Sequence, residues 1–192
     1  MDIANLIRFG GGLKSVMLAL SMLASLVACS RGLETYLVGQ WEYAVELELP
    51  TDSDTPGGVM KISCEEGYFP NKSVNSDCSF QIASETINQN GEAIETVIAG
   101  TYRATGEWSI AKGIVYVKTV DGKVDLQSIS VDGQGIADPA VIAEVRRNMG
   151  DVFIKGETTA VKTISINKSS WIFEEEVEKI VVRVSASRRV GS

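Results

Sequence analysis

The sequence predicts a mainly β domain, a single antiparallel lipocalin-like barrel or sandwich of about eight strands with one inserted amphipathic helix. Residues 37–50 alternate apolar with polar or acidic side chains at period two, which is typical of a strand with one wet face. The dipeptides Asn90-Gly91 and Asp121-Gly122 separate further runs of this kind, and such dipeptides favour tight turns between antiparallel strands. Many strands joined by short turns are typical of barrels and sandwiches.

The strand pattern recurs along the chain after the first strand ends at Pro50. Asp121-Gly122 predicts a hairpin at that point. Further runs enriched in β-branched and aromatic residues are 58–64, 78–84, 94–104, 106–111, 113–120, 123–131, 159–166, 171–178 and 179–187.

One stretch, residues 139–150, has helical instead of strand periodicity. Asp138 is a good helix N-cap, Pro139 suits the first helical position and Gly150 can end the helix. We expect this helix to cover one side of the sheet with its apolar face, which consists of Val141, Ile142, Val145 and Met149.

The composition excludes several functional classes. The 192 residues suit one domain, and a net charge of −7 argues against nucleic acid and against electrostatic binding to an anionic membrane. The chain has no histidine, which removes the Ser-His-Asp and Cys-His arrangements and the commonest transition-metal ligand. We therefore expect no enzyme, no catalytic residue, no metal and no cofactor, and no ligand-binding residue stands out.

The N-terminal region has the layout of a secretory signal. Arg8 and Lys14 precede an uncharged apolar run, Val16–Ala28. This run is shorter than the about 20 residues that span a bilayer, and it fits the apolar region of a signal peptide. A buried amphipathic helix is the alternative, but the run is apolar on all faces.

The end of that run, Leu26-Val27-Ala28-Cys29, resembles the lipobox of bacterial lipoproteins. The resemblance implies that residues 1–28 are cleaved and that Cys29 becomes the acylated N-terminus, with the acyl chains holding the protein stably to the membrane. Ser30 in place of Asp implies the outer membrane, with the domain facing the periplasm. Residues 29–36 would then be a short tether of at most ~28 Å, followed by the domain at 37–187 and a flexible tail at 188–192.

The two remaining cysteines, Cys64 and Cys78, are expected to form a disulfide in an oxidising compartment. The bond would close a loop of about 15 residues, worth about 3 kcal/mol in the chain-entropy model. Turn formers such as Gly67 and Pro70 lie between the cysteines, which predicts a pinned hairpin connection. The spacing is not that of a redox-active C-x-x-C pair.

The segment Gly39-Gln40-Trp41 resembles the G-x-W strand that begins lipocalins and lipocalin-like bacterial lipoproteins. Gly106-Glu107-Trp108 is similar to a mid-domain pattern of the latter group. The resemblance implies that Trp41 lies at the closed end of the barrel under an arginine of a late strand, for which Arg183 is the candidate. This pair would be a structural cation–π contact. The helix at 139–150 departs from the usual position of the lipocalin helix, which follows the last long strand.

These observations predict a non-enzymatic, outer-membrane-anchored binding module for a small apolar ligand or an envelope protein. The alternative is an accessory lipoprotein of a secretion or envelope system, similar to a pilotin, because some pilotins are distorted barrels interrupted by a helix. An enzyme is the third possibility. A small barrel can hold a ligand or be filled by its own side chains, and the sequence leaves both open.

Overall fold

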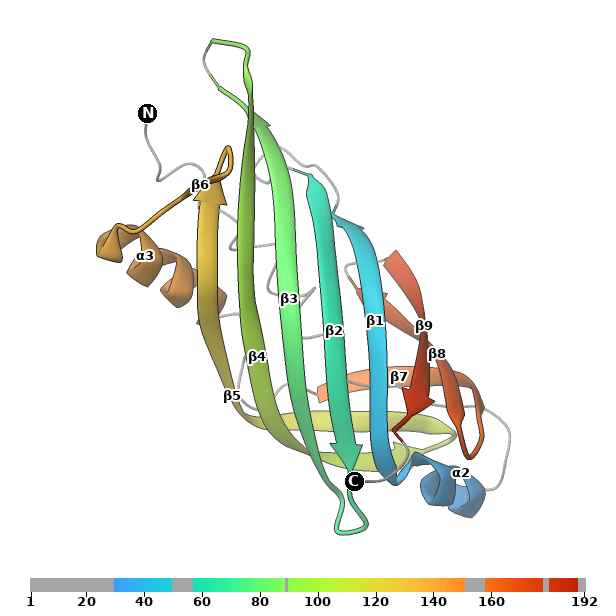
Figure 1. Ribbon diagram of the computed structural model, residues 1–192. Coiled ribbons are helices and arrows are strands. Elements are labelled where there is room, and N and C mark those ends of the chain that lie inside the picture. The colour runs from blue at the N-terminus through green and yellow to red at the C-terminus, as the bar shows by residue number, and fades with distance from the viewer. Residues whose placement is uncertain (1–29, 50–56, 89, 151–157, 178–179, 190–192) are drawn as a thin grey trace.

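A computed structural model describes residues 30–49, 57–88, 90–150, 158–177 and 180–189. The described elements form one antiparallel sheet of nine strands with two helices (Figure 1). In chain order they are α2 Ser30–Leu37, β1 Gly39–Leu49, β2 Gly58–Tyr68, β3 Ser73–Ile87, β4 Ala93–Ala111, β5 Ile114–Val131, β6 Gln134–Gly135, α3 Pro139–Gly150, β7 Thr158–Ile166, β8 Ser170–Val177 and β9 Ile180–Arg188.

The sheet closes on itself as a barrel. Its strand order is β4-β3-β2-β1-β9-β8-β7-β5-β6, and an additional pairing joins β4 to β5 (Figure 1). All strands except the two-residue β6 therefore belong to the ring, and β6 pairs only with the end of β5. The expected fold class is confirmed, in the form of a barrel.

The β2–β3 hairpin is longer than the sequence analysis predicted. Most of the expected loop between the cysteines is strand, and only residues 69–72 connect Tyr68 to Ser73. Inward-facing side chains continue at period two beyond Cys64, at Glu66 and Tyr68. Pairing with β1 and β3 on either side stabilises these residues as strand despite their turn formers.

The hairpin expected at Asp121-Gly122 is wrong, because β5 runs without interruption through it. Thr105 pairs with Asp121 and Gly106 pairs with Thr119, so Val120 is an extra residue in a β-bulge. The runs 94–104 and 106–111 likewise merge into the single strand β4. Because β4 and β5 pair on both sides of Asp121-Gly122, these two residues form a bend within β5 and not a hairpin turn.

The helix predicted at 139–150 is confirmed as α3. The Asp138 Oδ1 atom accepts a hydrogen bond from the Ala140 backbone N–H at 2.8 Å, as expected of an N-cap. Val145 and Met149 are buried, and the helix packs against β5.

Residues 30–37 form the helix α2 instead of the extended tether that the sequence analysis expected. Leu33 and Leu37 lie four residues apart, hence on one helix face, and are 3% and 0% exposed. The Trp41 indole N–H donates to the Leu37 carbonyl at 2.8 Å, which ties the helix to β1. Neither described helix has the length and hydropathy needed to span a bilayer.

The seam between β1 and β9 is the shortest closure of the main ring. Only Trp41 with Arg188 and Glu42 with Ser187 are paired across it, whereas β1 pairs with β2 along all 11 of its residues. Arg188 is the last residue of β9, and the Arg189 backbone N–H donates to the Gln40 carbonyl at 3.0 Å. Residues 188 and 189 therefore belong to the barrel and not to the flexible tail expected for 188–192, of which 190–192 lie outside the described residues.

Candidate functional site

Aromatic side chains fill the barrel interior near α2. Neighbouring rings meet mostly edge to face, with centroids 4.7 to 6.1 Å apart, a favourable geometry for aromatic pairs. Such packing leaves this part of the interior to the protein's own side chains. The rings belong to Trp41, Tyr43, Tyr68, Trp108, Trp171 and Phe173.

A single carboxyl group, Glu66, is buried beside these rings with 1% exposure. Its Oε1 atom accepts hydrogen bonds from the Tyr43 hydroxyl at 3.2 Å and the Ser76 hydroxyl at 3.1 Å. Its Oε2 atom accepts from the Tyr68 hydroxyl at 3.0 Å. Glu66 thus links strands β1, β2 and β3 from inside the barrel.

Burial raises the pKa of Glu66 to about 8, against the opposing effect of the hydrogen bonds from Tyr68, Ser76 and Tyr43. Burial also raises the pKa of Tyr102, and the nearby charge of Glu66 adds to this effect, while a hydrogen bond with Thr119 opposes it. At neutral pH the Glu66 carboxyl is therefore mostly protonated, and its O–H group then donates one of these hydrogen bonds to a hydroxyl oxygen.

Glu66 lies beyond the second strand expected from the sequence, 58–64, and so was not among the predicted site residues. The signal was present: Met60, Ile62 and Cys64 alternate inward, and continuing the period by one step places Glu66 inside.

The predicted disulfide between Cys64 and Cys78 is confirmed. The two cysteines lie directly opposite each other on β2 and β3, with 4.1 Å between their Cα atoms, and both are buried. Cys64 pairs with Tyr43 of β1, and Cys78 pairs with Tyr102 of β4. Since Glu66 follows Cys64 by two residues on β2, the disulfide lies in the inward-facing row of side chains next to the row that contains Glu66.

The arginine over Trp41 is Arg188, and the assignment to Arg183 is wrong. Arg188 lies 4.7 Å from the Trp41 ring centroid and donates to the backbone carbonyls of Val38, at 3.0 Å, and Tyr36. Arg183 is exposed on the outer side of β9, because strand alternation turns it away from its buried neighbours.

Gly39 is required for this contact. Its φ of +145° disfavours other residues, and a Cβ atom there would overlap the Arg188 guanidinium group. The glycine and tryptophan of the G-x-W segment therefore both serve the contact with Arg188.

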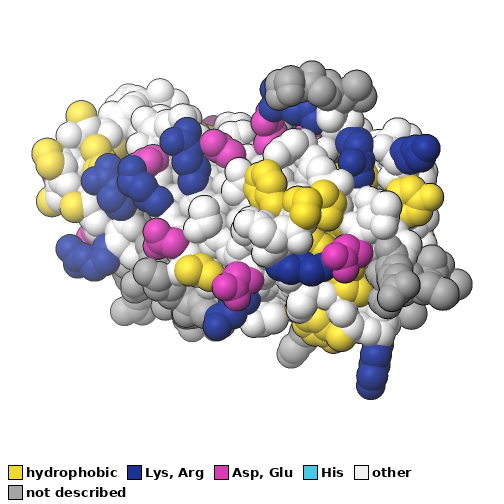
Figure 2. Space-filling model, turned by 90° about the horizontal axis from the view of Figure 1, so that it is seen from below, with side chains coloured by type: hydrophobic (Ala, Val, Ile, Leu, Met, Phe, Trp, Pro, Cys, Tyr) yellow, Lys and Arg dark blue, Asp and Glu magenta, His cyan; other side chains and the backbone are white. Residues whose placement is uncertain are grey.

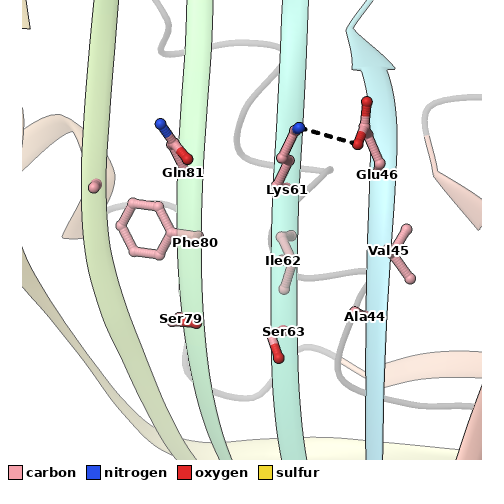
Figure 3. Close-up of a pocket in the computed structure, with 10 residues that line it drawn as sticks. Ala44, Val45, Glu46, Lys61, Ile62, Ser63, Ser79, Phe80 and Gln81 are labelled. Carbon is pink, nitrogen blue, oxygen red and sulfur yellow. Dashed lines mark ion pairs between the residues drawn. The ribbon is translucent and has the colours of Figure 1, made fainter.

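A shallow pocket of about 560 Å³ opens on the outer face of β1–β4 (Figure 3). Small side chains from four strands line it, and Lys61 and Glu46 form an ion pair at 3.2 Å on its rim beside Gln81. The small lining residues are Ala44, Ser63, Ser79 and Ala99. Val45, Ile62 and Phe80, which alternate with outward-facing residues along their strands, also line the pocket.

The described residues bear on metal binding, whereas the expected acylation site lies outside them. Within the described ranges, no three His, Cys, Asp or Glu side chains gather in a way that could hold a metal ion. Cys29 and the signal-like residues 1–28 lie outside the described residues. The acylation site thus stays a prediction from the sequence.

Comparison with protein-family models and with curated proteins finds no match for this chain. The class that the structure defines is therefore that of its fold, an antiparallel β-barrel with a cross-strand disulfide and two short helices.

Proposed function

We propose that this chain is a lipoprotein of the bacterial cell envelope, held to the outer membrane through acyl chains on Cys29, with its barrel in the periplasm. The lipobox-like segment supports this proposal, as does the disulfide, which needs an oxidising compartment. The docking of α2 supports it too, because a helix that begins at Ser30 attaches the barrel directly behind the acylated residue.

We further propose that the lipocalin-like barrel is a non-enzymatic binding module whose partner is another envelope protein. The observation that carries this choice is the contrast between the interior near α2, which aromatic side chains fill, and the hollow on the outer face of β1–β4. A shallow hollow lined by small side chains and bordered by Lys61, Glu46 and Gln81 suits a protein surface better than an enclosed apolar ligand. The pilotin-like alternative has α3 in its favour, but that helix turns Val145 and Met149 into the core.

Site-specific photo-crosslinking in cells tests the binding face. A benzophenone amino acid at Gln81, on the pocket rim, should give a discrete adduct of higher mass. The same probe at Arg183, exposed on the neighbouring strand β9 and not among the residues that line the pocket, should give none. Ser63→Trp, which fills the floor of the pocket, should abolish the Gln81 adduct.

Equal adducts at both positions, or none at Gln81, would contradict a protein-binding pocket. Native mass spectrometry distinguishes the small-ligand alternative, because a bound apolar molecule would add a mass of a few hundred daltons that is lost on denaturation.

A further inference from the structure

Three strand connections lie at the same end of the barrel as α2. The strands are antiparallel, so every second connection returns to this end, and these are residues 69–72, 112–113 and 167–169 (Figure 1). The helix contacts β4 and β7, and Lys72 forms an ion pair with Glu34 of α2 at 2.5 Å. We call α2, these three connections and the end of β9 the anchor end.

The anchor end lies next to the proposed acylation site. Cys29 directly precedes Ser30, the first residue of α2, and Leu33 is already buried against the barrel. Four residues of helix rise only about 6 Å. Acyl chains on Cys29 would therefore hold this end of the barrel, and not a distant face, at the bilayer surface.

Two aromatic side chains are exposed at the anchor end. Tyr36, in α2, and Phe69, in the β2–β3 connection, are each 37% exposed. Figure 2 views the molecule from below, and hydrophobic side chains gather near the middle of this view with Lys and Arg side chains around them and acidic ones interspersed. Aromatic side chains are favoured at the level of lipid headgroups, where one part of the ring is apolar and another is wet.

The charges of the connections are polarised along the barrel. Each connection of the anchor end contains one lysine and no acidic residue, and β9 adds Arg188 and Arg189 there. The described connections of the other end carry Glu92 and Asp132. Among the described connections, the lysines therefore lie at the anchor end, where Glu34 of α2 pairs with Lys72 and Glu65 of β2 pairs with Arg189. The three lysines are Lys72, Lys112 and Lys168.

We propose that the anchor end is a membrane-contact surface, with Tyr36 and Phe69 at the headgroup level of an anionic phospholipid bilayer and the lysine rim around them. The acidic end then points away from the lipid. This inference rests on the proposed acylation of Cys29, and it goes beyond that proposal by orienting the barrel. The net charge of −7 predicted no electrostatic binding to an anionic membrane, but in this orientation the charge that faces the lipid is that of the anchor end alone.

Depth-dependent quenching in vesicles tests the orientation. The acylated protein, with Phe69→Cys or Ile87→Cys labelled with a nitrobenzoxadiazole dye, is reconstituted into vesicles of phosphatidylcholine and phosphatidylglycerol containing headgroup spin-labelled lipid. Ile87 is 66% exposed at the opposite end, and β3 alone spans about 50 Å between the two ends. The dye at position 69 should lose most of its fluorescence, and the dye at position 87 should keep it.

Charge reversal adds a matched control. Lys112→Glu with Lys168→Glu should reduce the quenching at position 69 in anionic vesicles, whereas Lys123→Glu, on the exposed outer face of β5, should not. Quenching at position 69 no stronger than at position 87, in protein that floats with the vesicles and carries acyl chains by mass spectrometry, would overturn the orientation alone. Protein that lacks acyl chains and does not float would overturn the proposed anchor as well.

Discussion

The free energy of unfolding should fall relative to a Glu66→Gln variant as the pH rises from about 4.5 to about 8. Folding raises the pKa of Glu66 from 4.5 to about 8, so in this window the folded state holds a proton that the unfolded state releases. The stabilisation is complete below pH 4.5 and is lost progressively up to about pH 8. At about 1.4 kcal/mol per pH unit over about 3.5 units, the total change is on the order of 5 kcal/mol.

Urea denaturation of both proteins at a series of pH values measures this difference. Glutamine has nearly the same shape and keeps an oxygen that can accept from Tyr43, Tyr68 or Ser76, but it does not titrate. Glu85→Gln is the control, since it makes the same substitution at an exposed position of the neighbouring strand β3, and it should not reproduce this difference from wild type. A constant difference between wild type and Glu66→Gln across this pH range would show that Glu66 is not a buried neutral acid.

Arg188→Ala should lower the free energy of unfolding by about 3 kcal/mol. The guanidinium group contributes a cation–π contact with Trp41 and hydrogen bonds to the carbonyls of Tyr36 and Val38, each worth about 1–2 kcal/mol. These contacts lie at the seam that only two residue pairs close, so little else replaces them. Denaturant unfolding of the variant at constant pH gives the value.

Arg183→Ala is the matched control for Arg188, because it removes the same side chain from an exposed position of the same strand and should change stability by less than about 0.5 kcal/mol. Arg188→Lys should recover only part of the loss, since an ammonium group lacks the planar fork of donors that reaches two carbonyls. Equal effects of the two alanine substitutions would refute the role of Arg188.

The sequence predicted the elements whose local pattern agrees with their tertiary contacts. The alternation of β1 and the capped helix α3 gave their positions to within a residue or two. The bend at Asp121-Gly122 could not be predicted as a bulge, because a turn dipeptide favours a hairpin unless a long partner strand pairs through it. The helix α2 depends on the burial of Leu33 and Leu37 against the barrel. The residues around them do not indicate this burial, so the helix could not be predicted from its own sequence.

In the candidate site too, the cysteine pair could be predicted from the sequence, whereas contacts that depend on strand register could not. Cys64 and Cys78 could be paired by counting, since they are the two cysteines left after Cys29. The partner of Trp41 could not, because strand alternation and the end of β9 decide whether Arg183 or Arg188 faces the ring. The pocket joins outward side chains of four strands, so it exists only once the register of the sheet is known.

The central claim is that Cys29 is the acylated N-terminus of a membrane-held barrel. Intact mass spectrometry of the protein extracted from the membrane fraction of expressing bacteria tests it most directly. We expect a chain that begins at Cys29 and carries the additional mass of two or three acyl chains, with the Cys64–Cys78 disulfide intact. A chain that retains residues 1–28, or one that begins elsewhere without acyl chains, would contradict it.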